Sequence, residues 1–294
     1  MNELIEGLVI SHLGQAIAVE VGGQILLCQT RRKLDTVAVG DKVMVTQSSP
    51  EQGRIEEILP RYSLLKRPSR NKKTRPVAAN IDNIYIVFAT EPHCDFLLID
   101  QYLAICENKN IEAILVHNKV DLSNLQAVES ELMDYEKLGY HCHKVSAKSN
   151  TGIAELKAAL NHHISIFAGQ SGVGKSSLTN AIIPDKQLKT NTVSEITKHG
   201  RHTTTAATLY HLPDGGDLID SPGVAIFGLA DLDERQLAWG YREFQPLLEQ
   251  CQFNDCRHLK DKGCAVRVAA ENGDIPMSRY QRFLKLREKM PTSM

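Results

Sequence analysis

Hydrophobic and polar residues alternate over short segments near the start of the chain. Such alternation predicts strands with one buried face, and turn-forming residues such as Gly14, Gly40 and Asp41 separate the segments. Five strands in about 55 residues are typical of a small closed barrel. We expect an oligonucleotide-binding (OB) barrel at residues 1–60, although an SH3-like barrel would give nearly the same pattern. The five segments are residues 8–11, 16–21, 24–29, 42–47 and 54–58.

The pattern changes after the barrel. Residues 61–78 hold too few apolar side chains for a core element and are interpreted as a linker. From residue 79 strands and helices alternate, beginning with the apolar run 84–89, which indicates a strand buried on both faces. Helices are expected at 97–107, 125–137 and 153–161, and strands at 113–117, up to 145, and at 164–168.

This alternation predicts a doubly wound α/β domain at residues 79–230. Strand patterns fade after about residue 229. Residues 239–248 and 277–289 have helical spacing, so a third, helical domain is expected at 231–294. The fold class is therefore multidomain α/β.

Composition limits the class of protein. The chain has 294 residues, of which 42% are hydrophobic and 23% charged, as in folded proteins with more than one domain. There is no apolar run of the roughly 18 residues that a membrane span needs, and the acidic start is unlike a secretory signal. We expect a cytoplasmic protein without a membrane partner. The seven cysteines are odd in number and mostly scattered, which argues against a disulfide framework.

Positive charge is clustered although the net charge is only −1. Such clusters can be a solvated linker and a polar helix face, but clustering in two places favours an anionic partner. The first cluster, without one acid, consists of Arg61, Lys66, Arg67, Arg70, Lys72, Lys73 and Arg75. The second consists of Arg279, Arg282, Lys285, Arg287 and Lys289, beside Glu288.

A phosphate-binding loop follows the strand predicted at 164–168 and precedes a helix. Its glycines let the backbone amides surround phosphates, Lys175 neutralises the outer phosphates, and the Ser176 hydroxyl is a ligand for Mg²⁺. The nucleotide-binding residues predicted here are Gly169, Gln170, Ser171, Gly172, Val173, Gly174, Lys175, Ser176 and Ser177.

Two further loops indicate that the base is guanine. In Asn118-Lys119-Val120-Asp121, the carboxylate can accept hydrogen bonds from the ring N–H and the exocyclic amine of guanine. Taken alone, Asp121 could equally be a helix cap. Ser146-Ala147-Lys148 also ends a strand and is similar to a second guanine loop, in which a backbone amide meets the base oxygen.

The remaining nucleotide motifs come later in the chain. Asp220, in Asp220-Ser221-Pro222-Gly223, suits a strand-end carboxylate that holds Mg²⁺ through water. Among Thr203, Thr204 and Thr205 we favour Thr204 as the threonine that closes on Mg²⁺, although any of them could instead begin the next strand. The guanine loops precede the phosphate loop, whereas ordinary small GTPases have them after it. The motif order thus predicts a circularly permuted GTPase that uses GTP/GDP.

Four ligand-type residues lie close together in the third domain. Three thiolates and one imidazole complete a tetrahedral Zn²⁺ site and leave no open position for a catalytic water. We therefore predict one structural zinc, in preference to buried free thiols and a surface histidine. The ligands are Cys251, Cys256, His258 and Cys264.

The permuted motifs, the small barrel and the Cys-Cys-His-Cys cluster together resemble the bacterial ribosome small subunit-dependent GTPase A (RsgA) family over essentially the whole chain. The resemblance implies a GTPase stimulated by the small ribosomal subunit, docked on ribosomal RNA, and acting in late subunit maturation. Val224 stands where Ras-like enzymes carry a water-orienting glutamine, and the family shares an apolar residue there. His202 is the nearest candidate to position the water, although it could be a solvent-facing loop residue.

We interpret the sequence as that of a monomeric GTPase that times an assembly event on ribosomal RNA. One alternative is a GTPase with similar chemistry that acts on a protein or membrane partner. Another is an RNA-binding adaptor without enzymatic activity whose core the nucleotide stabilises. Salt-dependent RNA binding, and GTP turnover with and without small subunits, discriminate between these functions.

Overall fold

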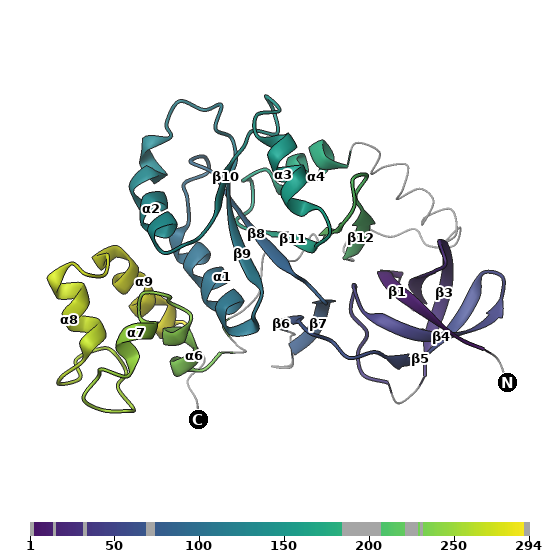
Figure 1. Ribbon diagram of the computed structural model, residues 1–294, viewed down its shortest axis with the longest axis horizontal. Helices are drawn as coiled ribbons and strands as arrows, with labels where there is room; N and C mark the ends of the chain where they lie inside the picture. Colours follow the sequence, from purple (N-terminus) through teal and green to yellow (C-terminus); the bar gives the residue numbers. More distant parts are fainter. Residues whose placement is uncertain are drawn as a thin grey trace.

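The computed structural model describes residues 3–13, 16–31, 34–68, 74–183, 207–220, 229 and 232–290. Three units lie in a row, with a β-barrel at one end, an α/β unit in the middle and a helical unit at the other end (Figure 1). Across the described residues, no helix combines the length and apolar character needed to cross a bilayer.

The first unit is a closed barrel. Its sheet order is β1-β2-β3-β5-β4, with β4 pairing back on β1 and with β3 parallel to β5. This closure is the arrangement of an OB barrel, which decides between the two barrel types that the sequence left open. Valine and isoleucine side chains such as Val9, Val43 and Ile55 fill its core. The strands are β1 (Leu4–Leu13), β2 (Ala16–Val21), β3 (Gln24–Thr30), β4 (Lys42–Ser49) and β5 (Gln52–Ile58).

The expectation that no core element follows the barrel is wrong. Strands β6 (Leu64–Pro68) and β7 (Thr74–Ala79) form an antiparallel hairpin, and it contributes Leu65 and Ala78 to the core. The Val39 carbonyl of the barrel accepts a hydrogen bond from the Ala79 amide at 2.8 Å. A hairpin satisfies its backbone groups by pairing, so it needs few apolar side chains.

The middle unit is the predicted doubly wound sheet. Its strand order is β10-β9-β8-β11-β13-β12, and every neighbouring pair is parallel except β12–β13. Strand β8 is buried along its whole length, as its unbroken apolar run predicts. The strands are β8 (Asn83–Phe88), β9 (Glu112–His117), β10 (Cys142–Lys144), β11 (Ile164–Ala168), β12 (Thr208–His211) and β13 (Asp217–Asp220).

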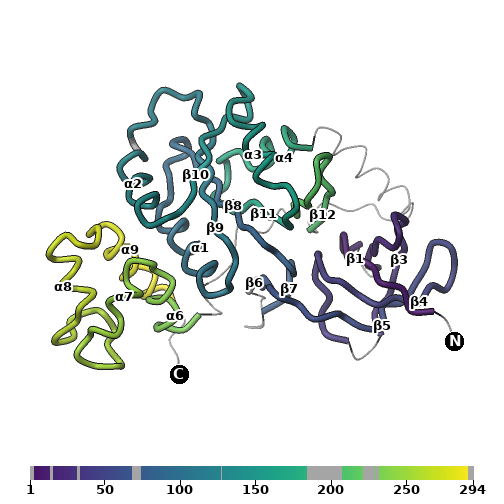
Figure 2. Tube along the Cα trace, viewed as in Figure 1, coloured from purple at the N-terminus to yellow at the C-terminus, as the bar shows by residue number. Residues whose placement is uncertain are grey.

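Helices cover both faces of this sheet. Side chains of α1 (Phe96–Lys109) and α2 (Gln126–Lys137) pack with the C-terminal helices in one core. Those of α3 (Ile153–Leu160) and α4 (Lys175–Ile182) belong to a second core. The chain trace in Figure 2 follows this alternation of strands and helices from the hairpin to α4.

The C-terminal unit is helical, as expected, but its helices differ from those predicted. The segment 239–248 is not one helix. Helix α6 (Glu234–Trp239) ends before Gly240, and a separate short helix, α7 (Gln245–Leu248), follows with Pro246 in its first turn. A Cβ on Gly240 would lie 2.6 Å from the Cα of Ala104, so glycine permits close approach to α1. Helix α8 (Ala265–Asn272) was not predicted, whereas α9 (Met277–Glu288) was.

Candidate nucleotide site and zinc centre

The phosphate-loop sequence connects β11 to α4, as predicted. The Lys175 ammonium donates hydrogen bonds to the Gly169 and Gln170 carbonyls, each at 2.7 Å, so it lies across the loop. Burial lowers the pKa of Lys175, and the negative charge of Asp220 opposes that shift. Ser176 and Ser177 lie exposed in the first turn of α4. The loop therefore places its charged and hydroxyl groups at the carboxyl edge of the sheet.

Asn118 joins the three predicted loops. Its side chain is buried, and its amide nitrogen donates to the Val173 carbonyl in the phosphate loop at 2.8 Å. Its amide oxygen accepts from the Ala147 backbone N–H at 3.3 Å. A Cβ on Gly174 would lie 2.3 Å from this amide nitrogen, so only glycine fits beside it. Residues that lie 29 and 55 positions from Asn118 along the chain thus meet at its side chain.

Lys119 and Asp121 complete the first guanine loop. The Lys119 ammonium donates to the Gly172 carbonyl at 2.8 Å and to the Glu91 carbonyl at 2.7 Å. Asp121 is exposed, and the Ser146 hydroxyl donates to its Oδ1 at 2.6 Å. This hydrogen bond is the main cause that lowers the pKa of Asp121. The carboxylate is therefore charged and held in position, which a helix cap alone would not require.

Asp220 ends β13 beside the phosphate-loop strand β11. A carboxylate and a serine hydroxyl are hard oxygen ligands of the kind that Mg²⁺ prefers, so Asp220 and Ser176 fit this ion by their chemistry. The other predicted switch residues, His202, Thr203, Thr204, Thr205 and the segment 221–224, lie outside the described residues.

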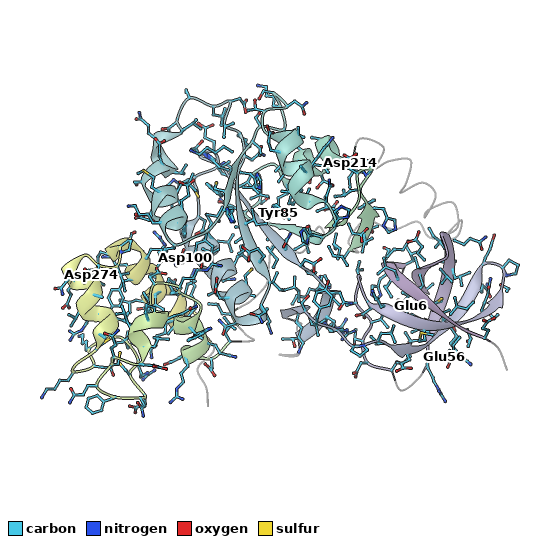
Figure 3. All side chains as sticks on the ribbon, viewed as in Figure 1. Glu6, Glu56, Tyr85, Asp100, Asp214 and Asp274 are labelled. Carbon is cyan, nitrogen blue, oxygen red and sulfur yellow. The ribbon has the colours of Figure 1, made fainter. Side chains whose placement is uncertain are left out.

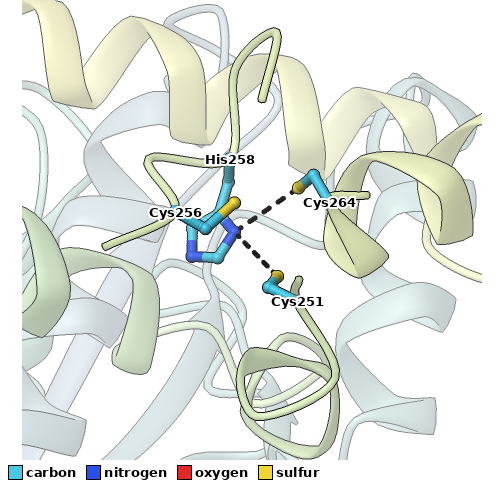
Figure 4. A group of neighbouring side chains, drawn as sticks. All are labelled: Cys251, Cys256, His258 and Cys264. Atoms are coloured by element: carbon cyan, nitrogen blue, oxygen red, sulfur yellow. Dashed lines mark hydrogen bonds between the residues drawn. The ribbon is translucent and has the colours of Figure 1, made fainter. Parts of the chain in front are cut away.

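The four predicted zinc ligands come together in the C-terminal unit (Figure 4). Their ligand atoms all lie within 4.8 Å of one another. His258 Nδ1 is 3.6 Å from both Cys251 Sγ and Cys264 Sγ. A tetrahedral zinc with Zn–S of about 2.3 Å and Zn–N of about 2.0–2.1 Å would separate such atoms by roughly 3.6 Å. The donor set and its spacing therefore fit Zn²⁺.

Neighbouring groups fix this cluster. Cys264 begins α8, where its sulfur accepts a hydrogen bond from the Arg267 amide at 3.4 Å. The Tyr280 hydroxyl of α9 donates to the His258 carbonyl at 2.7 Å. Burial raises the pKa of Cys256 to about 12, so a bound cation would be needed to keep this group as a thiolate.

The C-terminal basic cluster is largely internal, which corrects its interpretation as a surface for an anionic partner. Arg279 is buried and pairs with Asp100 of α1 and with Glu243. Arg282 binds Asp100 and Glu131. Arg287 pairs with Glu234 at 2.8 Å. Sequence reasoning missed these partners, although Asp100, an acid among the apolar residues of the predicted helix 97–107, is a signal for a buried ion pair.

Arg61 in the first basic cluster is also bound internally. Its guanidinium makes two hydrogen bonds to the buried Asp41 carboxylate, at 2.7 and 2.6 Å. By contrast, Arg67 and Arg75 are exposed and lie directly opposite each other on the β6–β7 hairpin. Among the described residues of this cluster, the exposed arginines thus lie on a two-stranded ribbon.

The site geometry agrees with comparisons to known proteins. The family model described as "RsgA GTPase" matches residues 58–230. A "Small ribosomal subunit biogenesis GTPase RsgA" from Hahella chejuensis (strain KCTC 2396) is 43% identical, with 97% of this chain and 84% of the relative covered. The protein named "Small ribosomal subunit biogenesis GTPase RsgA 1" from Vibrio vulnificus (strain YJ016) is 45% identical, with 97% and 83% covered.

Two solved structures share the whole fold. The crystal structure of YjeQ from Thermotoga maritima is 34% identical, with a TM-score of 0.79 and 98% of each chain covered. YloQ, described as "a circularly permuted GTPase", is 26% identical, with a TM-score of 0.75 and 99% of this chain and 98% of that chain covered. The permuted order of the nucleotide loops, the three units and these similarities lead to one conclusion: the chain belongs to the RsgA GTPase family and is a GTP hydrolase.

Proposed function

We propose that this protein binds the small ribosomal subunit and its ribosomal RNA and uses GTP hydrolysis to time a late step of subunit maturation. The named relatives support the partner. The observation that carries the RNA-binding part is the opposed pair Arg67 and Arg75. Like charges directly opposite each other destabilise a hairpin, so an anionic ligand such as a phosphate backbone offsets their repulsion.

In this proposal the loops joined by Asn118 bind the nucleotide. Asp121 accepts hydrogen bonds from the guanine edge, while the Ala147 amide, which lies between Ser146 and Lys148, meets the base oxygen. The phosphate loop surrounds the phosphates, and Lys175 neutralises their outer charge. Ser176 and Thr204 would bind Mg²⁺ directly, and Asp220 would hold it through water. When bound, the ion would supply positive charge that offsets the negative charge developing on the phosphates.

Hydrolysis needs an oriented water, and Val224 cannot orient one. We therefore assign this role to His202, and we expect slow intrinsic turnover that the subunit stimulates. The C-terminal cluster binds one structural Zn²⁺. We further propose that the protein acts as a monomer, since no proposed site needs a residue from a second copy, and that it acts with its ribosomal partner in the cytoplasm.

Co-sedimentation tests the partner. With a non-hydrolysable GTP analogue, the protein should pellet with small but not large ribosomal subunits, and small subunits should raise its GTP turnover. The double variant Arg67→Gln/Arg75→Gln should bind more weakly and lower the salt slope of binding by about two, since each phosphate contact contributes roughly one. Lys137→Gln, which removes an exposed lysine on α2, is the matched control and should bind like the parent.

Other outcomes of this experiment would support the alternatives. Turnover that small subunits do not stimulate would remove the proposed timing role. Binding that persists in the double variant with the parent's salt slope would place the RNA contact away from the hairpin.

Base choice is tested at Asp121. Asp121→Asn exchanges a double acceptor for a group with one acceptor and an unwanted donor. Because hydrogen bonds to charged groups contribute about 1.5–3 kcal/mol, GTP affinity should fall about 10- to 150-fold, while xanthosine triphosphate binding should improve. A variant that still binds GTP as tightly as the parent would show that the base lies elsewhere.

A further inference from the structure

The barrel is paired directly with the nucleotide-binding sheet. Strand β1 joins β12 at Ser11 and Thr208, so barrel and α/β strands form one continuous sheet of 11 strands. The Ser11 side chain is buried, and its hydroxyl donates to the Ala207 carbonyl at 3.1 Å. The same oxygen lies 3.0 Å from the Thr208 hydroxyl. One serine of the barrel thus holds the end of β12 through backbone and side chain.

A local irregularity in β1 turns this serine toward β12. The pairing of β1 with β2 shifts register between Val9 and Ser11, as in a β-bulge. Val9 belongs to the barrel core, whereas Ile10 packs into the core shared with α1. Bulges re-aim side chains and are common near active sites, so this one allows β1 to serve both units.

The contact lies in register with the proposed magnesium carboxylate. Thr208 pairs with Asp220 across β12 and β13, so Ser11, Thr208 and Asp220 occupy one row of the sheet. Neighbouring strands lie about 4.8 Å apart, which places the Ser11 backbone roughly 10 Å from that of Asp220. Asp220 in turn acts electrostatically on Lys175. The barrel therefore contacts the sheet two strands away from the phosphate-binding groups.

We propose that Ser11 is a positioning residue, through which the barrel sets the position of β12 beside Asp220 and so tunes the binding of Mg²⁺ with GTP. The proposal rests on the role assigned to Asp220 under the proposed function. Coupling of this kind is reciprocal: a barrel ligand that shifts β1 changes Mg²⁺–GTP affinity, and Mg²⁺–GTP changes the affinity of the barrel for that ligand by the same factor.

The far end of β12 supplies a matched control. There His211 contacts Glu20 of the barrel at 2.7 Å and Asp217 at 2.5 Å. Glu20→Gln weakens the attachment of the barrel without touching the row that contains Asp220. A role of Ser11 in attachment alone would therefore give both variants the same effect.

The test uses the full chain and a fluorescent non-hydrolysable GTP analogue titrated with Mg²⁺. In Ser11→Ala, the Mg²⁺ concentration that gives half-maximal binding should rise by between about 2- and 30-fold, the usual range of such couplings. Affinity for GDP in excess chelator should stay the same. Ser11→Thr, which keeps the hydroxyl, should restore the parent's value to within about twofold, and Glu20→Gln should match the parent.

Two results would overturn the proposal: an unchanged Mg²⁺ requirement in Ser11→Ala, or equal shifts in Ser11→Ala and Glu20→Gln. If Ser11→Ala does not fold, Thr208→Val removes the partner hydroxyl from the other side and should shift the Mg²⁺ requirement in the same direction. Asp220→Asn separates this proposal from the proposed site. If it leaves the Mg²⁺ requirement unchanged, Asp220 is not at the ion and the site assignment fails, whatever Ser11 does.

Discussion

The central α/β unit makes contacts of very different kinds with its two neighbours. At the α1–α9 junction with the C-terminal unit, where Asp100 is labelled in Figure 3, Asp100 and Arg279 are each 1% exposed and form an ion pair. At the β1–β12 junction with the barrel, Ser11 pairs with Thr208 across the two strands. The His211 side chain at the far end of β12 is 50% exposed. The first junction contains buried ion pairs, whereas the β1–β12 pairing is a short polar contact beside barrel residues such as Ile10 that pack into the shared apolar core.

This difference teaches which neighbour can respond to the nucleotide. Breaking a buried ion pair leaves a charge without compensation in a low-dielectric interior, so separation at α1–α9 is costly. Aromatic rings enclose the pair, with the Arg279 guanidinium 4.5 Å from the centre of the Tyr241 ring. The C-terminal unit is therefore held in one orientation. The β1–β12 pairing contains no buried ion pair among the described residues, so binding energies of a few kcal/mol are enough to shift it.

The largest expected effect comes from breaking the α1–α9 junction. Asp100→Asn leaves Arg279 and Arg282 without their shared carboxylate, so the free energy of unfolding should fall by about 3–5 kcal/mol. Chemical denaturation measures this change. Lys137→Gln, which removes the exposed 3.2 Å pair with Asp134, is the control and should cost less than about 1 kcal/mol. Equal losses in the two variants would mean that burial does not strengthen the junction.

A change in the Cys-Cys-His-Cys cluster tests whether metal binding in the C-terminal unit is independent of nucleotide binding in the central unit. Cys256→Ala leaves three ligands, so zinc affinity should fall by more than about 100-fold, because even loss of an outer hydrogen-bond partner costs 10- to 100-fold. Zinc content by elemental analysis should then lie well below one ion per chain, and nucleotide affinity should change little. Cys142→Ala in β10 is the control. A variant that keeps one zinc per chain, or one whose nucleotide binding collapses, would contradict this prediction.

The smallest effect is a pH dependence at the β1–β12 junction. Hydrogen bonding to Asp217 is the main cause that raises the pKa of His211 to about 9, with a further contribution from Glu20. Since the folded pKa lies above the ordinary value of 6.5, protonation stabilises the fold fully below about pH 6.5, and this contribution is lost as pH rises through 9. Exposure limits the contribution to about 0.5–1 kcal/mol.

This prediction can be measured as a difference between two proteins. The stability of the parent minus that of His211→Gln should decrease between pH 6.5 and 9.5, and titrations elsewhere cancel. A difference that stays constant over this range would show that His211 is not protonated in the folded junction.

Local features of the sequence predicted where the three loops lie in the fold, because each motif follows a recognisable strand. That these loops bind the nucleotide stays a prediction. The β6–β7 hairpin was missed because paired backbones replace the apolar side chains that a pattern would reveal. The C-terminal arginines were assigned to a partner because Asp100, their acid, lies 179 residues before Arg279. A local pattern can mark Asp100 as an acid in an apolar helix, but it cannot identify the arginines that pair with it.

That separation also determines the order in which the chain can fold during synthesis. Domains made first generally fold first, so α1 and its sheet are complete long before α9 leaves the ribosome. Until then, Asp100 lacks its partners Arg279 and Arg282 and must be hydrated instead. Contacts between distant residues also form slowly, because a long loop must close before they form. The junction that is most stable in the finished molecule is therefore the last to form, and a truncated chain would expose a helix face prepared for it.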